Sequence, residues 1–388
     1  MIAAPDPLDL YDLQSLLGDE ERLVKESVAS FVDREVLPII GRCFADQRFP
    51  AELVPTMAEL GLLGATLHGH GCAGVSHVSY GLICEELERG DSSLRSFVSV
   101  QTSLVMACID AYGTDEQKAH WLPAMSRGDV IGCFGLTEGH GGSDPASMKT
   151  RARRARGDWS ISGAKQWITN GGIADVAIVW ARTEEDIAAF LVETSSTGFA
   201  RKDIEDKLSL RASNTAELFL EDVKVPEASR LPGAEGLKAA LSCLDRARYG
   251  IAWGAVGAAR ACLGEALAYT AERRLFGHAL AETQLIQSRL ATAARKLTVA
   301  QLVAFRLGQL KERGVATPVQ VSLAKWNNVD TALEIARDCR DMLGAAGITT
   351  AHASMRHMLN LESVATYEGT RSIHELVVGR ALTGHAAF

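Results

Sequence analysis

The sequence predicts a mainly α-helical protein with a small antiparallel β domain in its middle. Three observations indicate this fold class: apolar residues recur at helical spacing up to about Gly128, short alternating runs begin near Val130, and long helical stripes return after residue 235. A chain of 388 residues is usually divided into two or three domains, so we place the boundaries at these changes of pattern. The prediction is an N-terminal α-helical domain over 1–130, a middle β domain over 131–235 and a C-terminal helical domain over 236–388.

The N-terminal domain is expected to consist of amphipathic helices. Within "DEERLVKESVASFVDREVLPII", one apolar stripe at helical spacing is formed by Leu23, Val28, Phe31, Val32 and Val36. Further helices are expected through "SYGLICEELERGDSSLRSFVSVQTSLVMACIDAYG". The first domain is therefore predicted to be mainly α.

The middle of the chain has the pattern of an antiparallel sheet. The segments "DWSISGAKQWITNGG", "ADVAIVWAR", "AAFLVE" and "AELFLEDVKVP" are short, alternating, β-branched or aromatic runs separated by turn signals. The following "ASRLPGAEGLK" contains Pro232 and two glycines close together. We interpret it as a linker.

Long helices are expected after this linker. One apolar stripe with alternating three- and four-residue intervals consists of Ile286, Leu290, Ala293, Leu297, Ala300, Val303, Leu307 and Leu310. A stripe of that length is typical of a helix bundle.

Composition and charge exclude two classes of protein. The formal net charge is −8 and the basic residues are dispersed, which lacks the clustered positive charge of a nucleic-acid-binding protein. No run approaches the roughly 18 apolar residues of a membrane span. The eight cysteines include no C-x-x-C pair and no signal peptide is evident, so we expect a reducing compartment and a cytoplasmic location. Small molecules or proteins are the expected partners, and no metal site is expected.

A glycine-rich stretch opens the β domain. In "CFGLTEGHGGSDPASMKTR", residues 133–151, glycines and hydroxyl residues such as Thr137 and Ser143 surround Asp144. Such a loop can point N–H groups and hydroxyls at a phosphate or a flavin edge, although an ordinary glycine-rich turn has the same composition. In "KQWITNGG", Trp167 beside Thr169 is either a core tryptophan or one that flanks a planar cofactor.

Two groups of residues in the C-terminal region also have two interpretations. Asp245 and Arg248 stand at i, i+3, as in a surface ion pair or in a phosphate- or adenine-binding pair. The other group, near a helix–turn–helix join, is formed by Arg273, Phe276 and Gln284. An exposed loop is the default interpretation of that group.

Three polar residues of the N-terminal domain are spaced by nearly whole helical turns. Glu88, Arg95 and Ser99 would therefore line one helix face. Such a face is commonly a solvated surface. The alternative is a guanidinium that grips a substrate carboxylate with its planar fork.

The stretch "SVATYEGTRSIHELVVGR" places an acid at the start of an apolar helix. Glu368 there could act with the helix dipole, and Ser372 to Glu375 fits an S-x-x-E capping box. The alternative is that Glu368 is a catalytic base.

Taken as a set, these motifs resemble the acyl-CoA dehydrogenase family, and within it most of all the glutaryl-CoA dehydrogenases. The resemblance covers the whole chain and rests on "GCAGVSHVSYGLICEELERGDSSLRSFVSVQTSLVM", "GCFGLTEGHGGSDPASMKTRA", "KQWITNGGIADVAIVWAR", "RARYGIAWGAVGA", "ARDCRDMLGAAGI" and "YEGTRSIHELVVGRALTG". It implies the acyl-CoA dehydrogenase fold, with an N-terminal α-helical domain, a middle β domain and a C-terminal four-helix bundle. This order agrees with the pattern read from the residues.

The resemblance implies that Glu368 is the family's base, which removes a proton from the carbon α to a thioester. The β-hydrogen then leaves as hydride to flavin N5. In the family, a flavin ribityl hydroxyl and the backbone N–H of the base donate hydrogen bonds to the thioester oxygen. A water-poor pocket would raise the pKa of this carboxylate toward neutrality.

The resemblance implies FAD as the cofactor and assigns residues around it. Positions on the flavin side and after the base are Phe134, Leu136, Thr137, Gly142, Ser143, Trp167, Ile168, Thr169, Thr370 and Ser372. Positions that reach the cofactor of a neighbouring subunit are Arg273, Phe276, Gln284 and Gly344. We therefore expect FAD binding to depend on oligomerisation, and a homotetramer is implied.

The resemblance also implies an acyl-CoA substrate. Positions at or near its site are Ser143, Asp245, Arg248, Tyr367, Gly369 and Arg380. Arg95 and Ser99 match positions that hold the distal carboxylate of a glutaryl group, and Glu88 matches the acid beside them. Because Glu88 and Tyr367 fit the decarboxylating type, the expected products are crotonyl-CoA and CO₂, with electrons passed to an electron-transferring flavoprotein.

Parts of the chain depart from the family pattern. "TEGHGGSDP" has Gly139 and His140 where most relatives carry Pro-Asn, and "LGAAGI" has Ala345 and Ala346 in place of a commoner Gly-Asn pair. The first of these loops adjoins the flavin and thioester positions. Two alternatives therefore stay open: a dehydrogenase for another short-chain or acid-tailed acyl thioester, and a non-catalytic flavoprotein that binds CoA thioesters.

Overall fold

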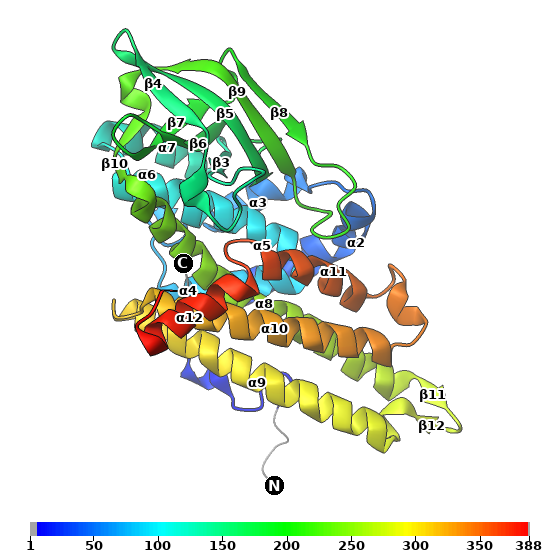
Figure 1. Ribbon diagram of the computed structural model, residues 1–388. Helices are drawn as coiled ribbons and strands as arrows, with labels where there is room; N and C mark the ends of the chain where they lie inside the picture. Colours follow the sequence, from blue (N-terminus) through cyan, green and yellow to red (C-terminus); the bar gives the residue numbers. More distant parts are fainter. Residues whose placement is uncertain (1–5, 387–388) are drawn as a thin grey trace.

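The computed structural model describes residues 6–386 and has helices on both sides of a central β region of the chain. Figure 1 shows the sheet at one end of the molecule and the long C-terminal helices at the other, with α5 and α11 between them. The predicted order of α, β and α is therefore confirmed.

The first part of the chain folds into helices, of which α1 and α5 pack on α4. Their bounds are α1 (Asp19–Phe31), α2 (Leu37–Ala45), α3 (Val54–Glu59), α4 (His77–Gly90), α5 (Ser92–Ser99), α6 (Ala107–Tyr112) and α7 (Asp115–Ser126). A short hairpin of β1 (His68–Gly69) and β2 (Cys72–Ala73) lies between α3 and α4. The predicted stripe is right for Val28, Phe31, Val32 and Val36, which are buried, but wrong for Leu23, which is exposed. Leu23 precedes Val28 by five residues, and that interval is not a helical repeat.

The middle of the chain forms an eight-stranded sheet. Its strands are β3 (Gly132–Gly135), β4 (Arg151–Ala155), β5 (Asp158–Thr169), β6 (Val176–Arg182), β7 (Ile187–Glu193), β8 (Phe199–Asp203), β9 (Thr215–Val225) and β10 (Arg230–Glu235). The order is β10-β7-β6-β4-β5-β9-β8, with β3 paired to β6. Most neighbours are antiparallel as predicted, whereas β3 runs parallel to β6. Buried aromatic side chains, among them Trp180 and Phe190, pack the sheet.

The segment predicted to be a linker is instead the edge strand β10. It pairs with β7 in an irregular register that shifts between Arg230 and Glu235. An edge strand tolerates Pro232 because one side of its backbone makes no ladder hydrogen bonds. Turn residues alone were therefore a misleading signal at this position.

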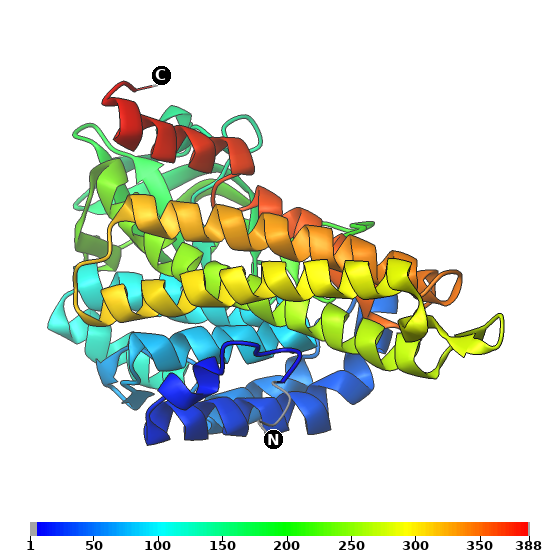
Figure 2. The same ribbon diagram turned by 90° about the horizontal axis from the view of Figure 1, so that it is seen from below.

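The last part of the chain is a helix bundle. Its helices are α8 (Gly236–Glu272), α9 (Gln284–Glu312), α10 (Pro318–Met342), α11 (Ala353–Thr366) and α12 (Arg371–Thr383). Figure 2 shows α9 and α10 side by side, with the hairpin of β11 (Arg274–Leu275) and β12 (His278–Ala279) projecting at one end. The predicted stripe lies within α9, and its residues Ile286, Ala293, Leu297, Ala300 and Leu307 are buried. Helix α4 packs on α8 and joins the bundle to the N-terminal helices.

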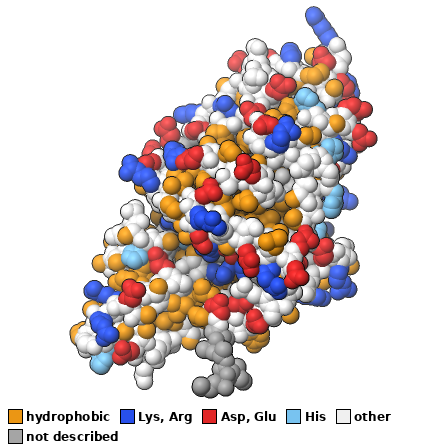
Figure 3. All heavy atoms as spheres, turned by 180° about the vertical axis from the view of Figure 1, so that it is seen from behind, with side chains coloured by type: hydrophobic (Ala, Val, Ile, Leu, Met, Phe, Trp, Pro, Cys, Tyr) orange, Lys and Arg blue, Asp and Glu red, His pale blue; other side chains and the backbone are white. Residues whose placement is uncertain are grey.

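The molecular surface agrees with the charge pattern of the sequence. On the face drawn in Figure 3, Lys and Arg side chains are interspersed with Asp and Glu side chains. Within residues 6–386, no helix combines the length and the apolar character that a membrane crossing needs.

Candidate active site

Glu368 occupies a strained turn between α11 and α12. Its φ of 51° lies in the left-handed region, which is unusual for a residue with a side chain, and Gly369 follows with φ 103°. The Thr370 side chain caps α12 by accepting a hydrogen bond from the backbone N–H of Ile373 at 3.4 Å. The capping box proposed for Ser372 is therefore wrong, because Ser372 is exposed inside the first turn of α12.

The carboxylate of Glu368 has an oxygen that is both buried and unpartnered among the described residues. Its Oε2 is buried, and within residues 6–386 no group forms a hydrogen bond to it. Burial raises the pKa of Glu368, although the positive charges of Arg95, Lys325 and Arg248 oppose that rise. The backbone N–H of Glu368 also has no acceptor among the described residues. A carboxylate and an N–H donor are thus available on the same residue.

The buried Lys325 and the largely buried Arg248 hold the backbone around Glu368. The Lys325 ammonium donates to the carbonyl oxygens of Tyr367 at 2.8 Å and Gly369 at 2.6 Å. The Nε of Arg248 donates to the carbonyl oxygen of Glu368 itself at 2.7 Å. Three consecutive carbonyls are therefore bound by cations, which stabilise the strained turn.

A buried polar cluster lies beside the turn. Arg95 is fully buried and its Nε donates to Glu88 Oε2 at 2.6 Å, while its Nη2 bonds to the Tyr367 hydroxyl. The Ser92 hydroxyl donates to the other oxygen of Glu88 at 2.9 Å. Two atoms of the cluster, Arg95 Nη1 and Ser99 Oγ, are buried without a partner among residues 6–386. Unpaired donors inside a protein are uncommon and indicate a place for an acceptor.

The solvated-surface interpretation of Arg95 is wrong, and so is the prediction of one helix face. Glu88 lies in the last turn of α4, whereas Arg95 and Ser99 belong to α5, which begins after a bend at Asp91. The Asp91 side chain caps α5 and also accepts from Arg356 at 2.9 Å and from Asn360 at 3.0 Å, both on α11. The bend therefore brings the three residues together and ties them to the helix that precedes Glu368.

A glycine on α8 makes room for this cluster. A Cβ at Gly254 would overlap the Glu88 carboxylate and lie 3.1 Å from Arg95 Nε. The backbone of α8 therefore lies directly against one side of the Glu88–Arg95 ion pair. Any residue with a side chain at position 254 would clash with this pair.

Of the residues that the resemblance assigns to the flavin, those before residue 170 lie near the ends of β3 and β5 or in the loop after β3, whereas Thr370 and Ser372 lie at the start of α12. Trp167 stands at a bulge of β5 with φ 61° and is 57% exposed. The core interpretation of Trp167 is thus wrong, and an exposed indole beside Thr169 fits the edge of a planar group. Phe134 and Leu136 are buried, so they would meet a cofactor through their backbone.

The glycine-rich loop is anchored by an ion pair that sequence reasoning missed. Glu138 accepts hydrogen bonds from Lys165 Nζ at 2.8 Å and from the backbone N–H groups of Lys149 and Thr150. Burial of Glu138 opposes ionisation, but these bonds outweigh it and lower its pKa to about 2. The half-buried Thr137 directly precedes Glu138, and the loop after Glu138 carries the exposed Gly142 and Ser143. No signal in the sequence indicates this pair, because a lysine in a strand usually marks a solvated position.

The remaining predicted positions divide into two places. Asp245 pairs with Arg248 at 2.8 Å next to the Glu368 turn, whereas Arg380 is exposed on α12. The positions assigned to a neighbouring subunit lie at the opposite end of the bundle from α12 (Figures 1 and 2), and these are Arg273, Phe276, Gln284 and Gly344. They are not brought to the Glu368 site of their own chain, and Phe276 is 98% exposed.

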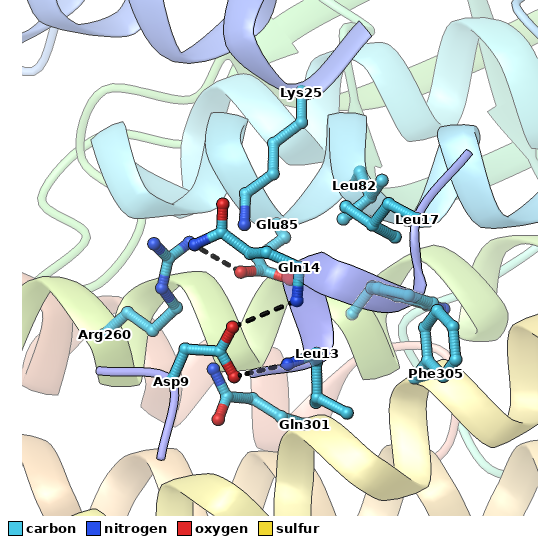
Figure 4. Close-up of a pocket in the computed structure, with 11 residues that line it drawn as sticks. Asp9, Leu13, Gln14, Leu17, Lys25, Leu82, Glu85, Arg260, Gln301 and Phe305 are labelled. Carbon is cyan, nitrogen blue, oxygen red and sulfur yellow. Dashed lines mark hydrogen bonds and ion pairs between the residues drawn. The ribbon is translucent and has the colours of Figure 1, made fainter. Parts of the chain in front are cut away.

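A separate cavity lies between the N-terminal segment and helices α4, α8 and α9. Figure 4 shows Asp9 accepting backbone hydrogen bonds from Leu13 and Gln14, with Arg260 bonded to Glu85 nearby. Its volume of about 30 Å³ has room for a water molecule or two. This cavity is too small for a substrate and is not part of the Glu368 site.

Comparison with known proteins gives matches along nearly the whole chain. Residues 18–129, 133–223 and 234–383 match the family models for the N-terminal, middle and C-terminal domains of acyl-CoA dehydrogenase. These three matches follow each other in the order of the helices, the sheet and the bundle.

Individual relatives agree with the family match. The structure is similar to that of glutaryl-CoA dehydrogenase from Mycobacterium smegmatis, with a TM-score of 0.98 and 52% identity over 99% of this chain and 100% of that one. A structure of a glutaryl-CoA dehydrogenase from the same organism in complex with FADH2 gives a TM-score of 0.98 and 51% identity with the same coverage. The mitochondrial short-chain specific acyl-CoA dehydrogenase of Bos taurus is 36% identical over 370 residues, which are 93% of this chain and 90% of the relative.

Proposed function

The chain belongs to the acyl-CoA dehydrogenase family, whose members are FAD enzymes, and we propose that it converts glutaryl-CoA to crotonyl-CoA and CO₂. The observation that carries the choice of substrate is the buried guanidinium of Arg95. One of its nitrogens and the Ser99 hydroxyl have no partner within residues 6–386. An acyl group that ends in a carboxylate would satisfy both donors, whereas a plain alkyl chain would leave them unpaired.

Glu368 is the proposed base. Its unpartnered, buried carboxylate takes the proton from the carbon α to the thioester, and its raised pKa matches that task. The N–H of the same residue donates to the thioester oxygen, where negative charge develops. Bound FAD would supply the hydride acceptor for the β-hydrogen, which leaves a double bond between the α and β carbons.

Loss of CO₂ follows from the position of the double bond. The bond between the γ-carbon and the distal carboxylate breaks, and its electron pair moves into the conjugated thioester. The Glu368 N–H again donates to the negatively charged thioester oxygen. The proton held by Glu368 then passes to the γ-carbon, which gives crotonyl-CoA. Arg95 and Ser99 hold the carboxylate until the carbon–carbon bond breaks, with Glu88 and Tyr367 fixing the guanidinium.

The FAD residues named from the resemblance are part of this proposal. The exposed Trp167 and the half-buried Thr169 at the end of β5 would hold the flavin together with Thr137, Gly142 and Ser143. A neighbouring copy of the chain would supply Phe276 and the residues around it. We propose a homotetramer on this basis and an electron-transferring flavoprotein as the acceptor.

The direct test is anaerobic titration of the purified protein with glutaryl-CoA. We expect the flavin absorption band at about 450 nm to bleach and mass analysis to find crotonyl-CoA. A band that glutaryl-CoA leaves unchanged but butyryl-CoA bleaches would move the function to another acyl thioester. A band that no acyl-CoA bleaches would favour a non-catalytic flavoprotein.

The role of Arg95 is tested with a double variant. Arg95→Met alone would leave Glu88 as an unpaired buried charge, so Glu88→Gln is combined with it. The double variant should raise KM for glutaryl-CoA by about 10–100-fold, because the charged hydrogen bonds to the distal carboxylate are lost. Butyryl-CoA turnover is the control and should change by less than about threefold. Equal losses with both substrates would contradict the assignment.

A further inference from the structure

Lys325 is a buried cation in the middle of α10 that has no assigned role. It is 1% exposed, and its ammonium donates to the carbonyl oxygens of Tyr367 and Gly369, the two residues that flank the base. A side chain with this much charge is almost never fully buried unless it is paired. Its partners are backbone oxygens of the catalytic turn, so its position calls for an explanation there.

We propose that Lys325 is a positioning residue that polarises the peptide group between Tyr367 and Glu368 and so strengthens the Glu368 N–H as a donor to the thioester oxygen. The inference rests on the proposed function, which brings the thioester oxygen to that N–H. It adds a residue that never touches the substrate and acts through one amide plane.

The geometry supports this action because the two ends of one peptide group are involved. The Tyr367 carbonyl and the Glu368 N–H belong to the same planar, conjugated unit. A charged donor on the carbonyl oxygen withdraws electron density from the nitrogen, and hydrogen bonds in such chains strengthen one another. Negative charge on the thioester oxygen grows during proton removal, so the stronger donor favours the transition state over the ground state.

The second bond of Lys325 fixes the direction of the same N–H. Glu368 is in the left-handed region with φ 51°, a conformation that persists only where the surroundings impose it. Lys325 binds the carbonyls before and after this residue, and Arg248 binds the carbonyl between them. Without Lys325 the turn would keep only one of these three bonds.

The charges that face Lys325 make its action depend on pH. The charged and titratable groups around Lys325 come from five elements. The turn itself presents Glu368 and Tyr367. The neighbouring helices present Arg248 from α8, Arg95 from α5, Asp330 from α10 and His374 from α12. Burial lowers the pKa of Lys325 to about 7. The positive charges of Arg248 and Arg95 also lower it, whereas the negative charge of Glu368 raises it. As the pH rises through this value, the Tyr367 carbonyl keeps only a neutral donor.

The test measures the polarisation of a bound thioester directly. The probe is crotonyl-CoA labelled with ¹³C at its thioester carbonyl, bound to the oxidised FAD-loaded enzyme and observed by difference infrared spectroscopy. In the unaltered enzyme the carbonyl stretch should shift down on binding, and the shift should shrink as pH rises through about 7. In Lys325→Met we expect a smaller shift at every pH. We also expect kcat with glutaryl-CoA to fall by about 10–100-fold while KM changes by less than about threefold.

Asn328→Leu is the matched control for loss of buried hydrogen bonds. Asn328 lies one turn further along α10, is 1% exposed, and donates to two backbone carbonyls, those of Ala252 and Ala300, away from the turn. In Asn328→Leu, the infrared shift of the bound probe and kcat should both stay within about threefold of the values for the unaltered enzyme, even if the melting temperature of the variant falls.

The outcomes separate this inference from the proposed function. An unaltered enzyme that leaves the probe's carbonyl stretch unshifted would contradict the proposed thioester site itself. A normal shift in the unaltered enzyme that Lys325→Met retains, or that Asn328→Leu loses equally, would overturn the role of Lys325 alone. If Lys325→Met does not fold, the pH dependence of the unaltered enzyme decides, and a shift constant across pH 7 would overturn the inference.

Discussion

At the scale of single residues, the site is governed by the competition between burial and charge at Glu368. Burial raises the pKa of this carboxyl, whereas three cations pull it down without reversing the rise. A carboxyl with a raised pKa is half-protonated at a higher pH than an exposed glutamate and accepts a proton more strongly. The same feature carries a cost, because ionisation of a buried carboxyl destabilises the folded chain.

Glu368→Gln should separate these two effects. We expect kcat to fall by about 10³-fold with unchanged flavin content, because a glutamine cannot accept the α-proton. In the unaltered enzyme, kcat/KM should fall as pH decreases through the raised pKa of Glu368. Stability should also decline as pH rises above about 4.5, the ordinary pKa, since the folded state then binds the extra proton.

Stopped-flow flavin reduction and thermal melts across pH check both statements. The Gln variant should lack the part of the stability decline that belongs to this carboxyl. Flavin reduction by substrate at the unaltered rate would remove Glu368 from the role of base.

At the scale of elements, the cluster around Arg95 depends on how helices are broken and how closely they pack. The bend at Asp91 lets residues of α4 and α5 meet, and Gly254 lets α8 approach their ion pair. Helical periodicity predicts neither feature. The spacing of Glu88, Arg95 and Ser99 fits one continuous helix as well as two helices with a bend between them. The sequence did indicate which residue types belong together, since Glu88, Arg95 and Ser99 were grouped from spacing alone.

Gly254→Ala tests the packing of α8 on this cluster. The added methyl group would overlap the Glu88 carboxylate, so we expect a loss of about 1–3 kcal/mol in the free energy of unfolding and a higher KM for glutaryl-CoA. Gly264→Ala on the same helix is the control, because its Cβ would lie at an ordinary 3.5 Å from Leu8. That control should gain about 0.5–1 kcal/mol from helix propensity. Denaturant unfolding and steady-state kinetics measure both, and equal behaviour of the two variants would contradict the packing argument.

At the scale of the whole molecule, the succession of helices, sheet and helices was predictable because hydrophobic periodicity changes with secondary structure. We propose the divisions at residues 130 and 235 as domain boundaries on the same pattern. Periodicity cannot identify a buried cation such as Lys325 or Lys165, since lysine in a helix or strand usually marks a solvated position. Their partners, backbone carbonyls and Glu138, are distant in sequence and become neighbours only through the fold.

Phe276 supplies a prediction about assembly. Its side chain is 98% exposed at the tip of the β11–β12 hairpin, and under the proposed function it reaches a neighbouring subunit. Phe276→Ser should lower both the mass of the oligomer at low protein concentration and the flavin retained per chain. Leu382→Ser is the control, since Leu382 is 82% exposed on α12 without such a role. Light scattering and flavin absorbance measure the two quantities, and a Phe276 variant that matches the control would contradict the prediction.

The hydrogen bonds of Asp91 have a consequence for the length of the acyl chain. Asp91 begins the helix that carries Arg95 and is bound by Arg356 and Asn360 of the helix that leads to Glu368. The span between the Glu368 carboxylate and the Arg95 guanidinium is therefore set by the scaffold and not by a ligand. Under the proposed function this fixed span selects the length of the acyl chain. A diacid one carbon shorter would not reach both Glu368 and Arg95, and one that is a carbon longer would be compressed between them.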